Sequence, residues 1–385
     1  MGNVCSFSKG YGISKDDLSI EGTPCILYGE LYTTYKTAIA KKIKSKTNLN
    51  PEKLFHSKEN DVIIPCSGET AEDIATSVCI PYDDILLGGD LTVIRSNLDG
   101  AFLSNQLNSA RKYDIARIAQ GKSIVHLQAE ELKKINIAFP SIEEQRKISG
   151  FIDLIDDRIA VQNKIISKYE TLIKGLKNQL YSRKARFTSH NKIPFPKWEK
   201  KQLSEILSIS TEKNGSQYSK EKVLSVSDEY GVVNQIKFQG KSFAGQDISN
   251  YKVVKSGQII YTRSPLAAKP FGIIKIVGNE IGIVSPLYIV NTVNNGYDAL
   301  FVFYLFDTPQ STNNYLKPLV RVGAKHTMNI SNDEWLSGTV IIPCLEEQKM
   351  IAGVLQSIDK KISFEKKVLE ILKEQKTYLL SKMFI

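Results

Sequence analysis

A long internal repeat constrains this chain more than any other feature of its 385 residues. The segment FPSIEEQRKISGFIDLIDDRI, from Phe139 to Ile159, returns as IPCLEEQKMIAGVLQSIDKKI, from Ile342 to Ile362, at an offset of 203 residues (342 − 139 = 203). One repeat unit covers more than half of the chain, far beyond the ~20 to 50 residues of a solenoid period. The repeat therefore predicts two large, similar halves.

The two copies agree position by position around a short acidic motif. Upstream of them, QGKSIVH and VGAKHTMN stand in equivalent places, and the opening GNVCSF aligns with SEILSI at 204–209. Each half is therefore a variable unit followed by a repeated tail. The matched residues are Pro140 with Pro343, Glu143, Glu144 and Gln145 with Glu346, Glu347 and Gln348, Ile148 with Ile351, Gly150 with Gly353, and Ile155 and Asp156 with Ile358 and Asp359.

The repeated tail has the apolar spacing of a coiled-coil helix. Steps of four and three residues alternate without a break, which is the a/d pattern of a helix seam. Proline precedes each tail and two glutamates open it, where the helix dipole favours carboxylates. Each tail predicts a helix of about 40 residues, roughly 60 Å long. The seam residues are Ile148, Ile152, Ile155, Ile159, Gln162, Ile166, Tyr169, Ile173, Leu176 and Leu180 in the first copy, and Ile351, Leu355, Ile358, Ile362, Glu365, Leu369, Leu372, Lys376, Leu379 and Met383 in the second.

A polar residue interrupts each seam at the fifth rank, Gln162 in one copy and Glu365 in the other. Polar seam residues cost stability and fix register or orientation. If a pseudo-twofold axis crosses the helices, they run antiparallel, and rank five of each helix is expected near rank six of the other. Ordinary bundle helices carry similar stripes. Two unbroken seams of equal length in one chain favour the coiled coil.

The composition provides material for two ordinary cores. Hydrophobic residues make up 42% of the chain and charged residues 24%, and no apolar run approaches the ~20 residues that span a bilayer. The first residues show no export-signal pattern, so we expect a cytoplasmic protein. The five cysteines form no CxxC pair and the four histidines are scattered. This spacing argues against a zinc site or a disulfide framework.

The net charge of +10 and the pI near 9.1 point toward a polyanionic partner without identifying it. Lysine usage on solvated faces explains part of this charge. Its distribution favours nucleic acid, because basic and aromatic residues interleave over residues 28–46. Glycine-containing segments at 262–272 and 320–327 also carry Arg or Lys.

The whole pattern predicts an α+β fold, in which two mixed α/β domains are joined by two long helices that form an antiparallel coiled coil with pseudo-twofold symmetry. Apolar periodicity predicts shorter helices at roughly 101–114 and 297–306. The basic, proline-punctuated stretch 182–203 predicts a linker between the halves. Strands are expected in β-rich runs bounded by Gly, Pro or Ser. These runs are 62–66, 84–89, 254–263, 271–277 and 281–290.

The sequence contains no recognisable catalytic motif. Two GKS triplets, at 121–123 and 240–242, lack the glycine that a phosphate loop needs five residues earlier, since Ala116 and Gln235 stand there. No GxSxG elbow, HExxH helix, dinucleotide GxGxxG or NPP-type methyltransferase tetrapeptide occurs. Glu199 lacks an upstream acidic partner for a metal-dependent nuclease. We therefore expect a chain without catalytic activity of its own.

The layout of variable unit, proline, Glu-Glu-Gln, Ile-Asp and long helix, present twice, closely resembles the specificity (S) subunit of type I restriction-modification enzymes. The segment IPFPKWEKKQLSEI before the second unit resembles that family's domain opening, and the resemblance covers essentially the whole chain. One departure is that the first unit begins at Met1 without a counterpart of FPKWEKKQ. A shortened chain, a different start codon and a natural variant each account for it.

The resemblance implies a non-catalytic DNA sequence-recognition subunit. Each variable unit would be a target recognition domain that reads one half of a bipartite DNA site. The helices would set the spacing and dock two methyltransferase (M) subunits, which restriction and translocation (R) subunits join. S-adenosylmethionine, ATP and magnesium are expected only on those partners. The implied domains are a first recognition domain at 1–139, a first spacer helix at 140–186, a linker with the second recognition domain at 187–342, and a second spacer helix at 343–385.

The candidate DNA-contacting residues lie mainly in two loops just before the helices, which resemble the family's glycine-containing DNA-facing loop. Lysine and hydroxyl donors suit phosphate oxygens and groove edges. For each candidate, a solvated or core-edge position is the alternative. The first-rank candidates are Lys122, Ser123, Lys325, His326 and Thr327. The second-rank candidates are Tyr28, Tyr32, Lys36, Arg263, Lys269 and Arg321.

Two other functions stay open on the sequence alone. An antiparallel coiled coil can scaffold other proteins as an adaptor that does not recognise DNA. A self-contained nuclease is disfavoured, because no coherent set of metal-binding carboxylates is found. Selection of a bipartite motif with a fixed gap from random duplexes, in the presence of M subunits, would distinguish the S subunit from both.

Overall fold

The computed structural model describes residues 1–121, 124–189, 191–263, 266–322 and 328–384. Internal contacts divide the chain into two compact units. Unit 1 comprises Met1–Lys168 with Ser363–Ile385, and unit 2 comprises Tyr169–Ile362. Each unit therefore combines one variable domain with one end of each long helix. Among the described residues, no helix has an apolar run long enough to cross a bilayer.

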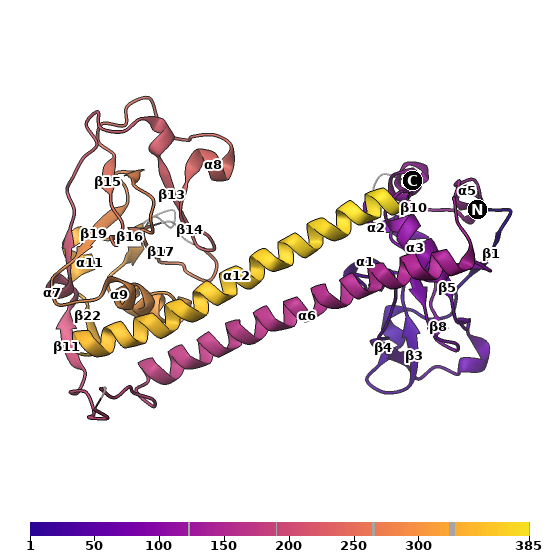
Figure 1. The fold of residues 1–385 in the computed structure, drawn as a ribbon, viewed down its shortest axis with the longest axis horizontal. Helices are drawn as coiled ribbons and strands as arrows, with labels where there is room; N and C mark the ends of the chain where they lie inside the picture. The colour runs from indigo at the N-terminus through magenta and orange to yellow at the C-terminus, as the bar shows by residue number, and fades with distance from the viewer. Residues whose placement is uncertain (122–123, 190, 264–265, 323–327, 385) are drawn as a thin grey trace. The chain divides into compact units, whose positions relative to one another are not determined.

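Two long helices, α6 (Ile142–Tyr181) and α12 (Leu345–Met383), begin at the repeated motifs (Figure 1). They contain 40 and 39 residues, which matches the predicted length. In unit 1, the first part of α6 contacts the last part of α12, where Asp156 pairs with Lys376 at 2.6 Å. In unit 2, the last part of α6 shares a core with the first part of α12. The helices therefore run antiparallel, as predicted.

The polar residues of the two seams meet. Every predicted seam residue is buried or half-buried. The side-chain amide of Gln162 donates to the carboxylate of Glu365 and, at 3.0 Å, to the backbone carbonyl of the same residue. Asp156, beside the third seam residue of α6, pairs with Lys376, the eighth of α12. The Gln162–Glu365 contact lets the two polar side chains satisfy each other instead of each burying an amide or carboxylate against leucine.

Unit 1 is built around an antiparallel sheet with the order β1-β9-β5-β7, beside a second sheet with the order β2-β4-β3-β8. Strand β5 is buried along its whole length, as its run of β-branched residues favours. The strands are β1 (Cys5–Lys9), β2 (Leu18–Ser19), β3 (Thr23–Ile26), β4 (Ser45–Thr47), β5 (Asp61–Pro65), β6 (Ser67–Gly68), β7 (Val78–Ile80), β8 (Leu86–Leu87), β9 (Leu91–Ser96) and β10 (Val125–His126). The short helices are α1 (Glu30–Thr33), α2 (Ala71–Ile74), α3 (Gly100–Asn108), α4 (Lys112–Ile118) and α5 (Ala129–Lys133), with 3-10 turns at Lys15–Asp17 and Pro51–Lys53.

Unit 2 repeats the main sheet in the same chain order, as β12-β19-β16-β17. Trp335 lies in its core, stacked on Tyr261 at 4.8 Å, and donates its indole N–H to Asn291 at 2.9 Å. The strands are β11 (Glu199–Gln202), β12 (Leu207–Ile209), β13 (Leu224–Ser227), β14 (Gly231–Asn234), β15 (Lys252–Val254), β16 (Ile259–Thr262), β17 (Ile273–Ile276), β18 (Gly282–Val284), β19 (Ile289–Val293), β20 (Arg321–Val322), β21 (Met328–Asn329) and β22 (Thr339–Ile342). The short helices are α7 (Leu203–Ile206), α8 (Gln235–Gln239), α9 (Ala299–Leu305), α10 (Pro309–Leu316) and α11 (Asn332–Ser337), with a 3-10 turn at Lys220–Lys222.

Three local predictions need correction. The helix predicted at 101–114 ends at Asn108 and a second one starts at Lys112. The side chain of Asn108 bonds both backbone groups of Ser77 at 2.8 Å, and such bonds compete with helix continuation. The run 281–290 contains β18 and the start of β19 instead of one strand. The predicted linker 182–203 ends in β11, because these residues pair with β22.

Candidate nucleic-acid interface

The glutamine of the repeated Glu-Glu-Gln motif ties each variable domain to its long helix. The side-chain carbonyl of Gln145 accepts from the backbone N–H of Asp99 at 3.0 Å, and its amide donates to the proline carbonyl before the helix at 2.8 Å. Gln348 makes the same two bonds, with Asp298 at 2.9 Å and its own proline at 2.8 Å. Asp99 and Asp298 cap the N-termini of α3 and α9. One side chain in each unit thus fixes the domain to the start of the helix.

The aspartate of the repeated Ile-Asp pair is buried or half-buried in both units. Asp156 pairs with Lys376 at 2.6 Å, and Asp359 accepts from the Tyr304 hydroxyl at 2.6 Å. Burial raises the pKa of both carboxyls, although the neighbouring donors oppose it. The motif therefore places one carboxyl at the same position in each unit, and its partner differs, a lysine of α12 in unit 1 and a tyrosine of α9 in unit 2.

The first predicted DNA-facing loop leaves unit 1 from a closed hairpin base. Gln120 and His126 exchange backbone hydrogen bonds of 2.9 and 2.7 Å, and β10 pairs with β6. Gly121 has φ +138, and a Cβ there would lie 1.9 Å from the carbonyl oxygen of Ile124. Glycine is therefore required at this turn. The candidates Lys122 and Ser123 lie between these residues, outside the described part of the chain.

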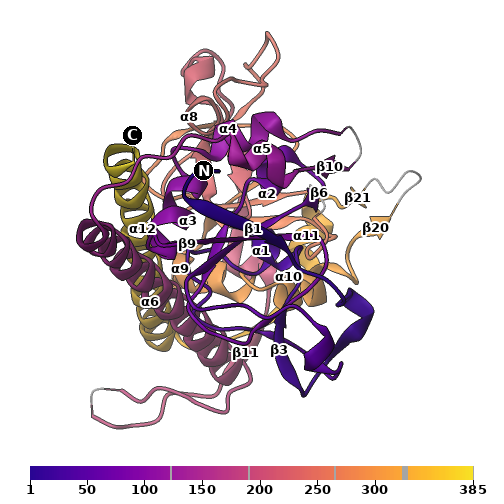
Figure 2. The ribbon, with the colours of Figure 1, turned by 90° about the vertical axis from the view of Figure 1, so that its right-hand side faces the viewer.

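The second predicted loop leaves unit 2 from an equivalent hairpin. Strands β20 and β21 pair with Arg321 opposite Asn329 (Figure 2). The Arg321 side chain is 85% exposed and lies 3.3 Å from Glu334, so its guanidinium is held at the surface beside the loop. The candidates Lys325, His326 and Thr327 lie outside the described residues.

The second-rank candidates of unit 1 gather near the first hairpin. Lys36 donates to the backbone carbonyl of Tyr32 at 2.7 Å. Burial raises the pKa of Tyr32, and Tyr28, Asp73 and Glu69 raise it further. Glu69 directly follows β6, and helix α2 contacts both β6 and β10 (Figure 2). Tyr32 thus lies near Tyr28 and near Glu69, the residue that follows β6.

The other candidates of unit 2 lie between β16 and β17. Lys269 is buried and pairs with Asp228, which also lies 3.3 Å from Lys275. Burial raises the pKa of Asp228, but the two lysines outweigh it and the pKa is lowered. The Nε of Arg263 is buried and has no hydrogen-bond partner among the described residues. Burial, and then the charge of Arg263, lower the pKa of Lys252.

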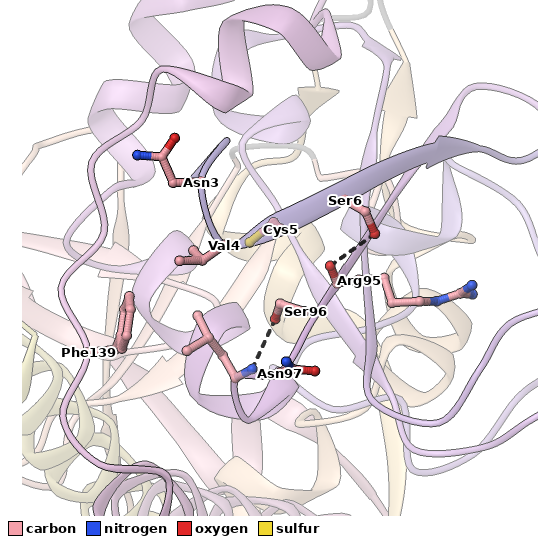
Figure 3. Close-up of a pocket in the computed structure, with 9 residues that line it drawn as sticks. Asn3, Val4, Cys5, Ser6, Arg95, Ser96, Asn97 and Phe139 are labelled. Atoms are coloured by element: carbon pink, nitrogen blue, oxygen red, sulfur yellow. Dashed lines mark hydrogen bonds between the residues drawn. The ribbon is translucent and has the colours of Figure 1, made fainter.

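A pocket of about 610 Å³ lies at the start of β1 and the end of β9 in unit 1 (Figure 3). Ser6 donates to the carbonyl of Arg95 at 3.3 Å, and the hydroxyl of Ser96 accepts from the N–H of Leu98 at 3.2 Å. Phe139, 44% exposed, lines the same pocket. None of the predicted DNA-contacting residues borders it, so it is separate from the candidate interface.

One lysine of the basic stretch 28–46 links the variable domain of unit 1 to α6. Lys41 pairs with Asp153 at 2.8 Å and Asp157 at 2.6 Å on α6. The sequence interpretation missed this role and the anchoring role of the two glutamines. The four-residue spacing of the aspartates, which puts both on one helix face, was the available signal.

The sequence pattern of the type I restriction modification DNA specificity domain matches residues 1–171 and 196–374, which is most of the chain. The chain belongs to this family. The prediction of a type I restriction-modification specificity subunit is confirmed by this match and by the relatives and solved structures that follow.

Two curated relatives come from Methanocaldococcus jannaschii. The chain is similar to the type I restriction enzyme MjaVIII specificity subunit, with 24% identity over 371 residues that cover 92% of this chain and 84% of that protein. It is also similar to the putative type I restriction enzyme MjaX specificity subunit, with 25% identity over 283 residues, 70% of this chain and 62% of that one.

Two solved structures share the fold. One is the S subunit of a type I restriction-modification system from M. genitalium, with a TM-score of 0.62 and 17% identity over 100% of this chain and 94% of that chain. The other comes from work on assembly and conformational transition of the type I R-M system, with a TM-score of 0.51 and 16% identity over 99% and 95%. The predicted two-domain architecture is thereby confirmed.

Proposed function

We propose that each variable domain of this specificity subunit reads one half of a bipartite DNA site. A repeated frame with divergent loops carries this proposal. The two units have the same main-sheet order and the same glutamine anchor, whereas their hairpins carry the different sequences QGKSIVH and VGAKHTMN. A common frame holding unlike loops suits the recognition of two unlike half-sites.

Within each domain, the proposed DNA contacts are centred on the hairpin loop. Lys122 and Ser123 in the first loop, and Lys325, His326 and Thr327 in the second, supply donors for phosphate oxygens and base edges. Arg321, exposed at the base of the second hairpin, and the Tyr32 and Lys36 group support these contacts. The net charge of +10 favours association with a polyanion.

The paired helices are proposed to set the distance between half-sites and to dock two M subunits, which R subunits join. A helix of 40 residues is roughly 60 Å long, which is comparable to one or two ~34 Å turns of B-DNA. In this proposal the chain itself performs no catalysis. S-adenosylmethionine, ATP and magnesium are then needed only on the partner subunits.

Selection from random duplexes tests the half-site assignment. The full chain, assembled with M subunits, is expected to enrich a bipartite motif with a fixed gap. Replacing Lys122 and Ser123 by alanine should relax one half-site, and replacing Lys325 and His326 should relax the other, so each pair serves as the control for its counterpart. Sequence-blind binding, or a change in both half-sites from one pair, would refute the assignment and favour an adaptor.

Matched deletions test the spacing role. Removing seven residues from both α6 and α12 preserves the seam pattern and shortens each helix by roughly 10 Å. The gap in the selected motif should shorten while both half-sites stay the same. An unchanged gap, or altered half-sites, would contradict a spacer function.

A further inference from the structure

In unit 2, strand β22 has one paired edge and one open edge. Strand β11 pairs with it antiparallel (Figure 1). The N–H of Leu203 donates to the carbonyl of Gly338 at 2.8 Å, and hydrogen-bonded residues alternate along an antiparallel ladder. The backbone groups of Val340 therefore face β11, like the carbonyl of Gly338, whereas those of Thr339 and Ile341 face the other edge. In the described part of the chain, no residue hydrogen-bonds this second edge.

The same two positions are closed in unit 1, where they are Asn136 and Ala138 (339 − 203 = 136 and 341 − 203 = 138). The carbonyl of Asn136 accepts from the guanidinium of Arg111 at 2.7 Å. The carbonyl of Ala138 accepts from the side-chain amide of Gln106, also at 2.7 Å. Unit 1 therefore caps this stretch of backbone with two of its own side chains.

Unit 2 lacks this cap because both donors are replaced. The N-cap residues of α3 and α9 set an offset of 199 residues for these helices (298 − 99 = 199). By this offset, Leu305 stands in place of Gln106 and Gln310 in place of Arg111 (305 − 106 = 199 and 310 − 111 = 199). A leucine side chain has no donor, and the amide of Gln310 donates to Asn314 at 2.8 Å. The open edge of β22 thus follows from two substitutions within the repeat.

A pocket of about 670 Å³ lies along this open edge, lined by residues 339–341 and by both replaced residues, Leu305 and Gln310. The indole N–H of Trp198 donates to the buried Glu347 at 3.2 Å, which fixes one wall. The hydroxyl of Tyr181 is buried and has no hydrogen-bond partner among the described residues. A ligand that bonds this hydroxyl would satisfy an otherwise unpaired buried group. The aromatic residues of the lining are Tyr181, Trp198, Phe306 and Tyr315.

The charge of the pocket favours an acidic ligand. Lys177 and Arg183 line it, and the described lining contains no aspartate or glutamate. Lys177 is neutralised by its ion pair with Asp307. Arg183 is exposed, and no described side chain pairs with its guanidinium. A carboxylate beside the pocket would therefore meet an unpaired cation.

We propose that the open edge of β22 and its pocket bind an extended, acidic segment of a partner polypeptide, which adds a strand to unit 2. An extended backbone presents donors and acceptors at the two-residue spacing of Thr339 and Ile341. One apolar side chain of the segment fills the pocket, and an acidic residue pairs with Arg183. None of the predicted DNA-contacting residues lines the pocket, so the proposal does not depend on DNA recognition.

Selection from a displayed library of random nine-residue peptides on the full chain tests this site. Enriched peptides should alternate apolar and polar residues and carry an acidic residue. The double variant Leu305→Gln, Gln310→Arg transfers the cap of unit 1 to this edge. An enriched peptide, labelled and followed by anisotropy, should bind this variant about 10-fold more weakly than the unaltered chain. Gln239→Arg adds the same charge at an exposed position outside the pocket, and this matched control should leave binding unchanged.

The charge assignment has its own test. Arg183→Gln should weaken binding of the enriched peptide about 3-fold. The same substitution should have no effect when the acidic residue of the peptide is replaced by its amide. An equal effect on both peptides would contradict the pairing with Arg183.

Hydrogen exchange on the unaltered chain locates the bound peptide. The amides of Thr339 and Ile341 should exchange more slowly in its presence, whereas those of Asn136 and Ala138 should not change. Urea unfolding followed by tryptophan fluorescence verifies that the double variant folds. Absence of any enriched peptide, protection outside β22, or equal binding to a folded double variant would overturn the proposal. Self-association of the chain that the double variant abolishes would assign the edge to a second copy and overturn the acidic partner.

Discussion

Units 1 and 2 share an inner frame and differ at its edge. The glutamine anchors, Gln145 and Gln348, make identical bonds in both units. The neighbouring glutamates do not, since Glu347 is buried in an ion pair and Glu144 is exposed. Each glutamine hydrogen-bonds to an aspartate N–H and a proline carbonyl, which both units have. The ion pair of Glu347 instead needs Arg186, a residue outside the repeated motif. Identical motifs therefore acquire different roles when their surroundings differ.

The largest expected difference between the units follows from the glutamate pair. Glu347→Ala should destabilise unit 2 by about 3 kcal/mol, because it leaves Arg186 and Trp198 without their buried acceptor. Glu144→Ala should change unit 1 by less than about 0.5 kcal/mol. Both tryptophans, Trp198 and Trp335, lie in unit 2, so urea unfolding followed by tryptophan fluorescence reports that unit. Hydrogen exchange reports the stability of unit 1. Equal losses of stability from Glu347→Ala and Glu144→Ala would contradict the predicted difference between the two units.

The glutamine anchors should show the opposite behaviour. Gln145→Ala and Gln348→Ala each remove two partly buried hydrogen bonds, which predicts a loss of about 2 kcal/mol in either unit. The two losses should agree within about 0.5 kcal/mol when local opening is measured by hydrogen exchange. A clear inequality would show that the anchors are not equivalent.

A pH-dependent difference is expected at Asp228. Its pKa is lowered in the folded chain, so the ionised carboxyl stabilises unit 2 above the ordinary value near ~3.9, and this contribution is lost as the pH falls through the lowered pKa. Asp228→Asn should cost about 1 kcal/mol at pH 7, a value reduced for its partial exposure. The cost should vanish in acid. Tryptophan-monitored unfolding as a function of pH checks this, and a pH-independent cost would contradict the ion-pair explanation.

The smallest expected effect concerns Lys41, which links the domain of unit 1 to α6. Its partners are solvent-accessible, and such pairs contribute at most about 1 kcal/mol. Lys41→Ala should therefore reduce the protection of unit 1 amides against hydrogen exchange only slightly in low salt, and not at all in high salt. Hydrogen exchange at two ionic strengths measures this. A large, salt-insensitive loss would mean that Lys41 acts through packing.

Much of the fold was predictable because it depends on local periodicity. The 3.5-residue spacing from Ile148 to Leu180 predicts a long helix wherever it lies in space, and the second copy doubles that prediction. The break after Asn108 was not predictable, since it depends on hydrogen bonds to Ser77, a residue distant in sequence. For the candidate interface, the equivalence of the two hairpins was visible in the sequence. The clustering of Tyr32 with that hairpin was not.

The sequence by itself determined the duplication, the two helices and the family, because each rests on residue spacing within one segment. Tertiary structure decided which partners those residues meet. Gln162 hydrogen-bonds to Glu365, since the two polar side chains complement each other across the two helices. Glu347 is buried where unit 2 brings Arg186 and Trp198 to it, while Glu144 is exposed and the described residues of unit 1 offer no such pair. Such contacts join residues far apart in the chain, and their energies depend on burial that no local pattern specifies.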